Sequence, residues 1–442
     1  MYDCSKILFL IVGTGNTKEA GYPEPYLKLL RQAIESTNAQ TVVLIPSGKS
    51  IANAEIIKSE YAGERDVQIE NLPSVSMEFD ADLCYEFFEK VFRKLFKSGY
   101  KPEGFTIDFT HGTKAMSAAL YAIGMRYRVS DFHYIKRNND KEGNLVEGQT
   151  VRTFDASYAR ALALLDQCKV LFCAWQFAAA KSLLATERPK SKELKARFER
   201  VQFLVDFYAA WDRLDYVAAA QIFPQCQIDG FEKFIPPASV KEELEMLARP
   251  VAQTDDANEL PAERMRKNGE LLCDLLIDLY ANAHRRIESG LLEDGGIRIY
   301  RIAEMLGQAC LFRKGYVSEQ MPARDDKVKF FAQNNGISPK KCGDLYLFGR
   351  EKAAEFLLKK ATSEDDAEHG VAAFLVEKNE EIRAMRNTSI LIHGFSSKAG
   401  AAEKMKCLAD DLLKQINCLY GIDNVGNKLK AALFMNKFKD ND

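Results

Sequence analysis

Residues 105–117 read Phe-Thr-Ile-Asp-Phe-Thr-His-Gly-Thr-Lys-Ala-Met-Ser, and this stretch decides the fold. Its first half predicts a short buried strand, its middle a polar glycine turn, and its second half, continuing through Leu120, a helix rich in small residues. Such a turn points backbone N–H groups, two hydroxyls and one ammonium at a single spot beyond the carboxyl end of the strand. That spot suits a phosphate.

Strand and helix signals alternate from the start of the chain to about residue 155. The segment from Pro25 towards Ile34 predicts a helix. Further buried strands are predicted by apolar runs at residues 7–12, 41–45, 67–69 and 132–135. Continuous apolar strands separated by helices indicate a parallel sheet covered on both faces, with its ligand at the carboxyl ends of the strands. Residues 138–144 read as a hairpin tip and residues 149–153 as its returning strand.

The pattern becomes helical after about residue 158 and stays helical almost to the end of the chain. Pro236, Pro237, Pro250 and the polar residues 253–256 mark a boundary inside this helical part. The predicted fold class is therefore an α/β Rossmann-like N-terminal domain, then an all-α connector, then an all-α C-terminal domain. The predicted boundaries are 1–155, 156–255 and 256–442.

Length, charge and cysteine usage bound the class of protein. At 442 residues the chain is long enough for two or three domains. Lysine and arginine number 61 against 63 acidic residues, so stable binding of duplex DNA is not expected. The ten cysteines form no CxxC pair and the start of the chain has no signal-peptide pattern, which favours a cytoplasmic setting. The early apolar run at residues 7–12 is too short to span a membrane.

Two familiar phosphate motifs fail in the N-terminal part. Residues 47–50, Ser-Gly-Lys-Ser, end like a P-loop, but Val43 stands where that motif needs glycine. Gly13 and Gly15 begin like a dinucleotide fingerprint, but Lys18 occupies the position of the third glycine.

Two polar turns remain, each after a strand of the predicted sheet, and together they predict an anion site across the strand ends. Each turn alone is equally compatible with an ordinary strand-to-helix connection, and Thr113 is suited to cap the helix that follows. The candidate ligand-binding residues are Gly13, Thr14, Gly15, Asn16 and Thr17 in the first turn, and Thr110, His111, Gly112, Thr113 and Lys114 in the second.

A second candidate site lies near the C-terminus, where residues 386–394 read Arg-Asn-Thr-Ser-Ile-Leu-Ile-His-Gly. On one helix, residues seven apart lie within roughly 20° of the same face, so Arg386 and His393 are expected to flank one phosphodiester with Asn387 at the edge. A guanidinium neutralises charge on phosphorus oxygens and an imidazole acts as general acid or base. RNA supplies its own nucleophile, the ribose 2′-hydroxyl. A solvated helix face is the alternative interpretation.

Metal ligation is not expected near His393, because neither HxxxH nor HExxH occurs there. A third polar group, Arg298-x-Tyr300-Arg301-x-x-Glu304, places Arg301 and Glu304 three residues apart. Helix neighbours at that spacing usually form a structural ion pair.

These motifs and their order resemble a known family. The Rossmann-like domain with Asp108-x-Thr110-x-Gly112-Thr113-Lys114 resembles CARF domains, which sense cyclic oligoadenylates in type III CRISPR systems. The all-α domain with Arg386, Asn387 and then His393 resembles HEPN ribonucleases. Together they are similar to the CARF–HEPN ancillary ribonucleases of the Csm/Csx class, with residues 158–249 unaccounted for.

The resemblance implies a function. It implies a cytoplasmic homodimer that takes a cyclic oligoadenylate as allosteric activator, needs no cofactor, and cleaves single-stranded RNA without a metal, leaving 2′,3′-cyclic phosphate and 5′-hydroxyl ends. Each protomer is expected to contribute Arg386 and His393 to one composite site. Two alternatives stay open: a non-catalytic sensor that signals to a partner protein, and a ring nuclease that degrades its own ligand.

Overall fold

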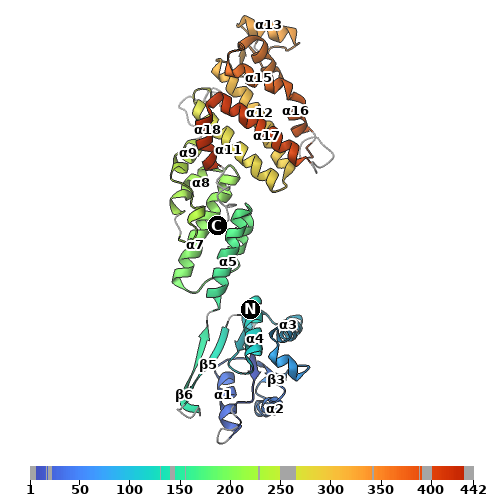
Figure 1. Cartoon of the computed structure of the whole chain (residues 1–442), viewed down its shortest axis with the longest axis vertical. Helices are drawn as coiled ribbons and strands as arrows, with labels where there is room; N and C mark the ends of the chain where they lie inside the picture. Colours follow the sequence, from blue (N-terminus) through green and yellow to red (C-terminus); the bar gives the residue numbers. More distant parts are fainter. Residues whose placement is uncertain are drawn as a thin grey trace. The chain divides into compact units, whose positions relative to one another are not determined.

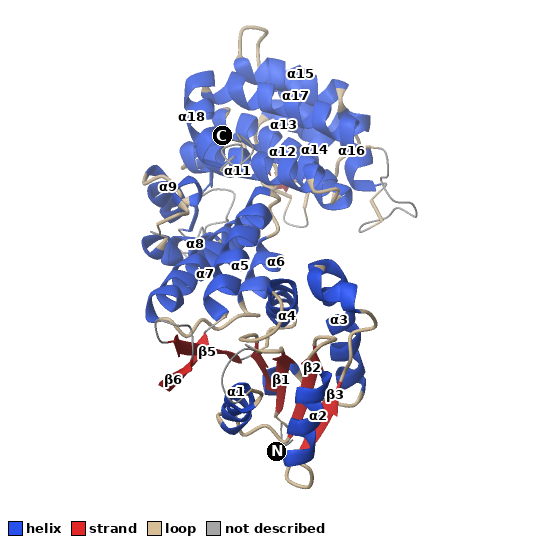
Figure 2. Ribbon diagram, turned by 60° about the horizontal axis from the view of Figure 1, so that its bottom comes forward, coloured by secondary structure: helices blue, strands red, loops and turns tan. Residues whose placement is uncertain are grey.

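The structure, a computed structural model, divides the chain into two compact units (Figures 1 and 2). Unit 1 comprises Met1–Ala163 and Glu187–Lys195, and unit 2 comprises Leu164–Thr186 and Ala196–Asp442. The residues that the structure describes are 6–15, 17, 22–129, 131–139, 145–154, 156–226, 229–248, 265–340, 343–387, 389–390 and 401–432.

A six-stranded sheet forms the centre of unit 1 (Figure 2). Its strands are β1 (Ile7–Val12), β2 (Thr41–Pro46), β3 (Asp66–Ile69), β4 (Phe105–Asp108), β5 (Asp131–Asn139) and β6 (Leu145–Phe154). They lie in the order β3-β2-β1-β4-β5-β6, and all neighbours are parallel except β5 and β6, which are antiparallel. The predicted Rossmann-like sheet and its returning strand are confirmed.

Helices cover both faces of this sheet, and every residue of β1 and β2 is therefore buried. The covering helices are α1 (Glu24–Glu35), α2 (Ile51–Glu60), α3 (Ala81–Lys97) and α4 (Lys114–Arg126). On one face Phe9 of β1 packs against α3, with its ring centroid 4.4 Å from that of Phe92. On the other face Leu10 packs with Leu30 of α1 and Ile57 of α2.

The strand order places the turns of interest next to each other. The chain runs outward from β1 in both directions, to β2 and β3 on one side and to β4 and β5 on the other. In open α/β sheets, ligands bind at the carboxyl ends of the strands where the order reverses. The turns after β1 and β4 both open at that point.

Unit 2 is helical. Its N-terminal part holds most of α5 (Ser157–Cys173) and α7 (Lys192–Asp212), together with α6 (Phe177–Leu184), α8 (Tyr216–Ile222) and α9 (Ser239–Ala248). Its C-terminal part holds α11 (Gly269–Glu288), α12 (Leu292–Arg313), α13 (Asp326–Asn334), α14 (Arg350–Phe356), the π-helical turn η5 (Leu357–Ala361), α15 (Ala367–Glu377), α16 (Asn379–Asn387), α17 (Ala402–Tyr420) and α18 (Ile422–Ala432).

The helical prediction for unit 2 is confirmed, with one addition. Two strands of two residues each, β7 (Met321–Pro322) and β8 (Leu345–Tyr346), pair antiparallel. A two-residue strand is too short to leave an alternating pattern in the sequence, so the pattern there predicts no strand. The C-terminal helices share one apolar core, in which Leu276, Leu306, Leu375 and Leu412 are fully buried.

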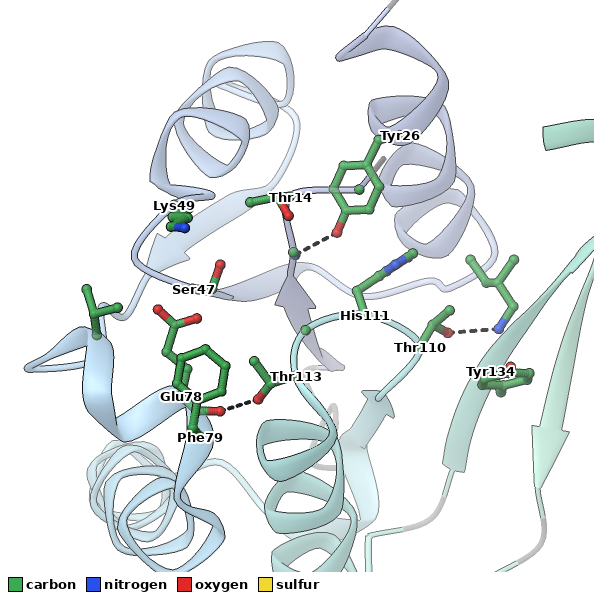
Figure 3. A pocket seen from close by; sticks show the side chains of 15 residues that line it. Thr14, Tyr26, Ser47, Lys49, Glu78, Phe79, Thr110, His111, Thr113 and Tyr134 are labelled. Carbon is green, nitrogen blue, oxygen red and sulfur yellow. Dashed lines mark hydrogen bonds between the residues drawn. The ribbon is translucent and has the colours of Figure 1, made fainter. Parts of the chain in front are cut away.

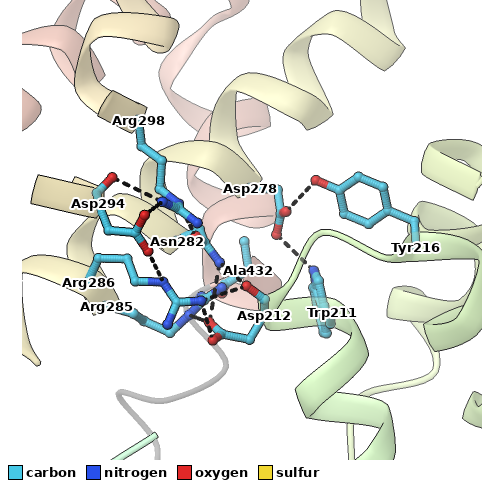
Figure 4. A network of polar contacts seen from close by, with 10 residues as sticks. All are labelled: Trp211, Asp212, Tyr216, Asp278, Asn282, Arg285, Arg286, Asp294, Arg298 and Ala432. Carbon is cyan, nitrogen blue, oxygen red and sulfur yellow. Dashed lines mark hydrogen bonds and ion pairs between the residues drawn. The ribbon is translucent and has the colours of Figure 1, made fainter. Parts of the chain in front are cut away.

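A buried polar network joins the end of α7 to α11 within unit 2 (Figure 4). Asp212 accepts hydrogen bonds from Arg285 Nε at 2.9 Å and from an Arg286 guanidinium nitrogen at 2.6 Å. Asp278 accepts from Trp211 Nε1 at 2.8 Å and from the Tyr216 hydroxyl at 2.7 Å. Burial raises the pKa of the Asp278 carboxyl. These contacts hold the predicted connector helices against the C-terminal helices.

The predicted domain boundaries remain predictions. Strand β6 ends at Phe154, next to the first predicted boundary, and the second falls among residues 249–264, outside the described part of the chain. The compact units group most of the predicted connector with the C-terminal helices.

Candidate functional site

A cavity of about 760 Å³ lies at the carboxyl ends of β1, β2 and β4 (Figure 3). Besides the turns that follow these strands, α1, β5 and the short 3₁₀ turn η1 (Val75–Phe79) contribute to its wall. The lining residues are Gly13, Thr14, Gly15, Tyr26, Ser47, Lys49, Val75, Glu78, Phe79, Thr110, His111, Gly112, Thr113, Tyr134 and Ile135.

Hydrogen bonds hold the start of the turn after β4. The Thr110 N–H donates to Asp108 Oδ1 at 2.8 Å, and the Thr110 hydroxyl accepts from the Ile135 N–H at 2.8 Å. Asp108 is fully buried, and burial raises the pKa of its carboxyl to about 6. The Thr110 hydroxyl therefore fixes the turn against β5.

The next two turn residues serve the fold as well as the cavity. Gly112 has a φ of +87°, and a Cβ there would collide with Ile11 Cγ2, so only glycine fits. Thr113 caps α4: its Oγ1 accepts from the Met116 N–H at 3.2 Å and donates to the Glu78 carbonyl. The capping role predicted for Thr113 is confirmed, and its hydroxyl hydrogen is committed to η1.

Tyr26 of α1 joins the two turns. Its hydroxyl accepts from the Gly13 N–H at 2.6 Å, and its ring meets the His111 ring edge-on at a centroid distance of 5.0 Å. His111 is only 3% exposed. The imidazole is therefore part of the packing between the turns as well as of the cavity wall.

Most of the predicted ligand-binding residues come together in this cavity. Those that line it are Gly13, Thr14, Gly15, Thr110, His111, Gly112 and Thr113. Thr17 and Lys114 are exposed and are not among the lining residues, and Asn16 lies outside the described residues. Lys114 is the first residue of α4, beside Thr113.

Sequence reasoning missed part of the wall. Residues 47–50 are not a P-loop, but they follow β2 beside β1, so Ser47 and the exposed Lys49 reach the same cavity. The signal was available, because parallel neighbouring strands end at one edge of a sheet. Glu78 and Phe79 arrive from η1, for which the sequence carries no strand-end signal.

The cavity combines charges and rings in a way that suits a nucleotide. Backbone N–H groups and the Lys49 ammonium favour phosphate. Phe79 is 74% exposed and Tyr134 is 39% exposed, so both rings offer a face to a base (Figure 3). Glu78 is buried with Oε1 accepting from the Gly48 N–H at 3.0 Å, and its carboxylate repels phosphate while accepting from hydroxyl or amino groups.

The candidate catalytic residues lie in unit 2. Arg386 and Asn387 are exposed at the end of α16. The Arg386 guanidinium carbon lies 5.3 Å from the centroid of the Tyr300 ring, and that of Arg350 lies 5.5 Å from the same centroid. Arg350 also donates to the Asn379 side-chain oxygen at the start of α16. Two guanidinium groups are thus held around one ring, where they can attract a phosphodiester.

His393 lies outside the described residues. The expectation that one helix carries both Arg386 and His393 can still be tested on the residues between them. Helix α16 ends at Asn387, and Ser389 and Ile390 are not helical. The expectation that Arg386 and His393 share one helix is therefore wrong. Asn, Thr and Ser in succession are weak helix formers, because their side chains compete for backbone hydrogen bonds.

The third polar group behaves as its spacing predicted. Arg301 and Glu304 form an ion pair of 3.1 Å on α12, with both side chains partly exposed. Within the described ranges, no group of three or more His, Cys, Asp or Glu side chains is arranged to hold a metal ion. Likewise, none of the described helices combines the length and apolarity needed to cross a membrane.

Comparison with known proteins bears on both units. A family model described as the Csm6 HEPN domain matches residues 264–416. Among solved structures, Enterococcus italicus Csm6 bound to cyclic hexa-2′-fluoro-hexa-dAMP is similar with a TM-score of 0.57 and 13% sequence identity, over 98% of this chain and 99% of that one. A search of the curated proteins finds no match. The predicted resemblance to CARF–HEPN proteins of the Csm/Csx class is confirmed.

Proposed function

We propose that this protein is an endoribonuclease of type III CRISPR antiviral defence that a cyclic oligoadenylate switches on. The observation that carries the proposal is the pairing of two features in one chain. A nucleotide-sized cavity lies at the strand ends of unit 1, and exposed Arg386 lies inside a segment that matches a Csm6 HEPN domain. We place its action in the cytoplasm as part of this proposal.

In the proposed chemistry, the ribose 2′-oxygen attacks the adjacent phosphorus and the bond to the 5′-oxygen breaks. His393 of one protomer takes the proton of the 2′-hydroxyl, and His393 of the other gives a proton to the departing 5′-oxygen. Arg386 neutralises the phosphorus oxygens, and Asn387 orients the phosphodiester. The products are a 2′,3′-cyclic phosphate and a 5′-hydroxyl. No metal is needed, since the nucleophile is intramolecular and the charge is met by guanidinium. Two protomers form the homodimer, and each contributes one set of these residues.

The proposed activator binds in the cavity of unit 1. The similar Enterococcus italicus protein was solved with a cyclic hexanucleotide analogue, which supports a ring-shaped ligand of this class. Phosphates are proposed to lie against the turns after β1 and β4 and near Lys49, and bases against Phe79 and Tyr134. The exposed residues Lys114 and Thr17 are proposed to contact the ligand, and so is Asn16. Binding then shifts the dimer towards an arrangement in which the two catalytic sets act.

The test is an RNA cleavage assay in EDTA, with cyclic tri-, tetra- or hexa-adenylate or none, alongside thermal shift with each ring. We expect one ring to raise the melting temperature and to start cleavage that leaves 2′,3′-cyclic phosphate ends. A shift without cleavage under any ring would favour the non-catalytic sensor. Linear product from ring incubated with the His393→Ala protein would assign ring nuclease activity to unit 1.

Lys49→Ala is expected to weaken activator binding about tenfold, since it removes one ammonium that meets a phosphate. Cleavage at saturating activator should be unchanged. Lys114→Ala should act in the same direction with a smaller loss, because its side chain lies outside the cavity wall. The matched control is Lys58→Ala, which removes an exposed lysine of α2 away from the cavity. Calorimetric titration with the active ring measures all three, and equal affinities for Lys49→Ala and Lys58→Ala would contradict the assignment.

A further inference from the structure

A second hollow, of about 470 Å³, lies on unit 2 between α13 and η5. Its lining includes neither Arg350 nor Arg386, which flank the Tyr300 ring, and none of the residues that line the cavity of unit 1. Its lining residues are Asp326, Lys327, Lys329, Phe330, Gln333 and Lys360.

An exposed aromatic ring lies in this hollow. Phe330 is 53% exposed, and the Lys360 ammonium lies 4.8 Å from the centroid of its ring. A single exposed phenylalanine is ordinary on a protein surface. Here, however, one face of the ring carries a cation and the ring borders a hollow, which is the arrangement of a stacking platform for a nucleic acid base.

The lysines of the hollow are available to a ligand. Lys327, Lys329 and Lys360 have no ion pair with any carboxylate in the described part of the chain, and Asp326 is the one acidic residue among those that line the hollow. Neighbouring lysines differ: Lys352 and Lys359 both pair with Glu355, at 2.9 and 3.4 Å.

Lys360 is carried by a π-helical turn. Residues 357–361 continue α14 in π geometry, and such turns are rare and occur often at functional sites. The turn brings Lys360 over Phe330 of α13, so it completes the hollow.

We propose that this hollow binds single-stranded RNA, with a base stacked on Phe330 and phosphates against the three lysines. Single strands expose base faces that a duplex buries, so an exposed ring flanked by cations favours the single strand. The inference rests on the proposed function, in which the same class of RNA is cleaved. It adds a binding site that the candidate catalytic residues do not include.

One continuous helical segment, α14 followed by η5, links the hollow to the residues around Tyr300. Helix α14 starts at Arg350, whose guanidinium lies on the Tyr300 ring with that of Arg386, and η5 carries Lys360 at its other end. With a rise of at most about 1.5 Å per residue, the backbones of Arg350 and Lys360 lie no more than about 15 Å apart along this helical segment. We infer that the hollow serves as an anchor for an RNA strand that extends to the candidate catalytic residues.

The experiment measures binding without cleavage. In the full-length Arg386→Ala protein, a fluorescein-labelled 20-mer of uridines is titrated by anisotropy at several salt concentrations, with and without Phe330→Ala or Lys329→Glu. We expect Phe330→Ala to weaken binding about tenfold. Lys329→Glu should weaken binding and reduce the slope of log affinity against log salt by about 0.7. Matched controls are Phe203→Ala on α7 and Lys430→Glu on α18, both at exposed positions of unit 2; their affinities should not change.

Unchanged affinity with Phe330→Ala, or equal affinity for a duplex of the same length, would overturn the proposal. So would preferential binding of an acidic peptide. A cleavage assay with protein that retains Arg386 separates this inference from the proposed function. If activated wild-type protein cleaves RNA, Phe330→Ala should raise KM with kcat unchanged. If wild-type protein cleaves no RNA, the proposed function fails while the anisotropy result still decides the anchor.

Discussion

Arg386→Ala is expected to lower the rate of RNA cleavage by about 10²- to 10³-fold, which is the usual cost of removing one preorganised charge from a developing oxyanion. Arg386 is exposed, and its guanidinium carbon lies 5.3 Å from the centroid of the Tyr300 ring. The aromatic contact positions the guanidinium, which forms no ion pair among the described residues. Activator binding should be unchanged, because Arg386 belongs to unit 2 and the cavity to unit 1. The measurements are single-turnover cleavage at saturating activator and calorimetric titration of the activator.

The same helix offers a matched control. Arg383 is also an exposed arginine of α16, but its guanidinium pairs with Glu380 at 2.6 Å, so Arg383→Ala should leave the cleavage rate within about twofold. His393→Ala should behave like Arg386→Ala, since it removes the general acid or base. Cleavage that survives His393→Ala, or equal losses for Arg383→Ala and Arg386→Ala, would refute the catalytic assignment.

The sequence predicted the parts of the fold that follow local rules. Residues 105–117 form β4, a glycine turn and α4 as expected, because a continuous apolar run, a threonine cap and a run of small helix formers all act within a few residues. Gly112 is where the turn requires a positive φ, and Thr113 caps α4. Each of these features depends on neighbours in the chain.

The sequence could not predict what tertiary packing brings together. Glu78 and Phe79 enter the cavity because the Glu78 carbonyl accepts from Thr113, a contact between residues 35 apart. Lys49 belongs to a stretch that fails as a P-loop motif, and it reaches the site only because β2 lies beside β1. Arg350 joins the Arg386 cluster only through the shared Tyr300 ring. None of these pairings has a local pattern.

Asp212→Ala is expected to lower the free energy of unfolding of unit 2 by about 3–5 kcal/mol, because removing one partner of a buried pair leaves an uncompensated charge. Asp212 is 7% exposed and Arg285 is 2% exposed, and the carboxylate accepts from both Arg285 and Arg286 (Figure 4). The Asn282 amide also donates to the Asp212 carbonyl at 2.8 Å. Chemical denaturation followed by tryptophan fluorescence suits the measurement, because Trp211 is adjacent and buried.

A second aspartate of α7 tests whether burial is the cause. Asp206 pairs with Lys181 at 2.6 Å, but that lysine side chain is 58% exposed, so Asp206→Ala should cost at most about 1 kcal/mol. Both substitutions remove one carboxylate from the same helix, and only the Asp212 carboxylate faces two arginines of α11. A similar loss for the two variants would mean that the contact with α11 contributes little. A large loss for Asp212→Ala alone, with one transition in the unfolding curve, would mean that the connector helices and the C-terminal helices unfold together.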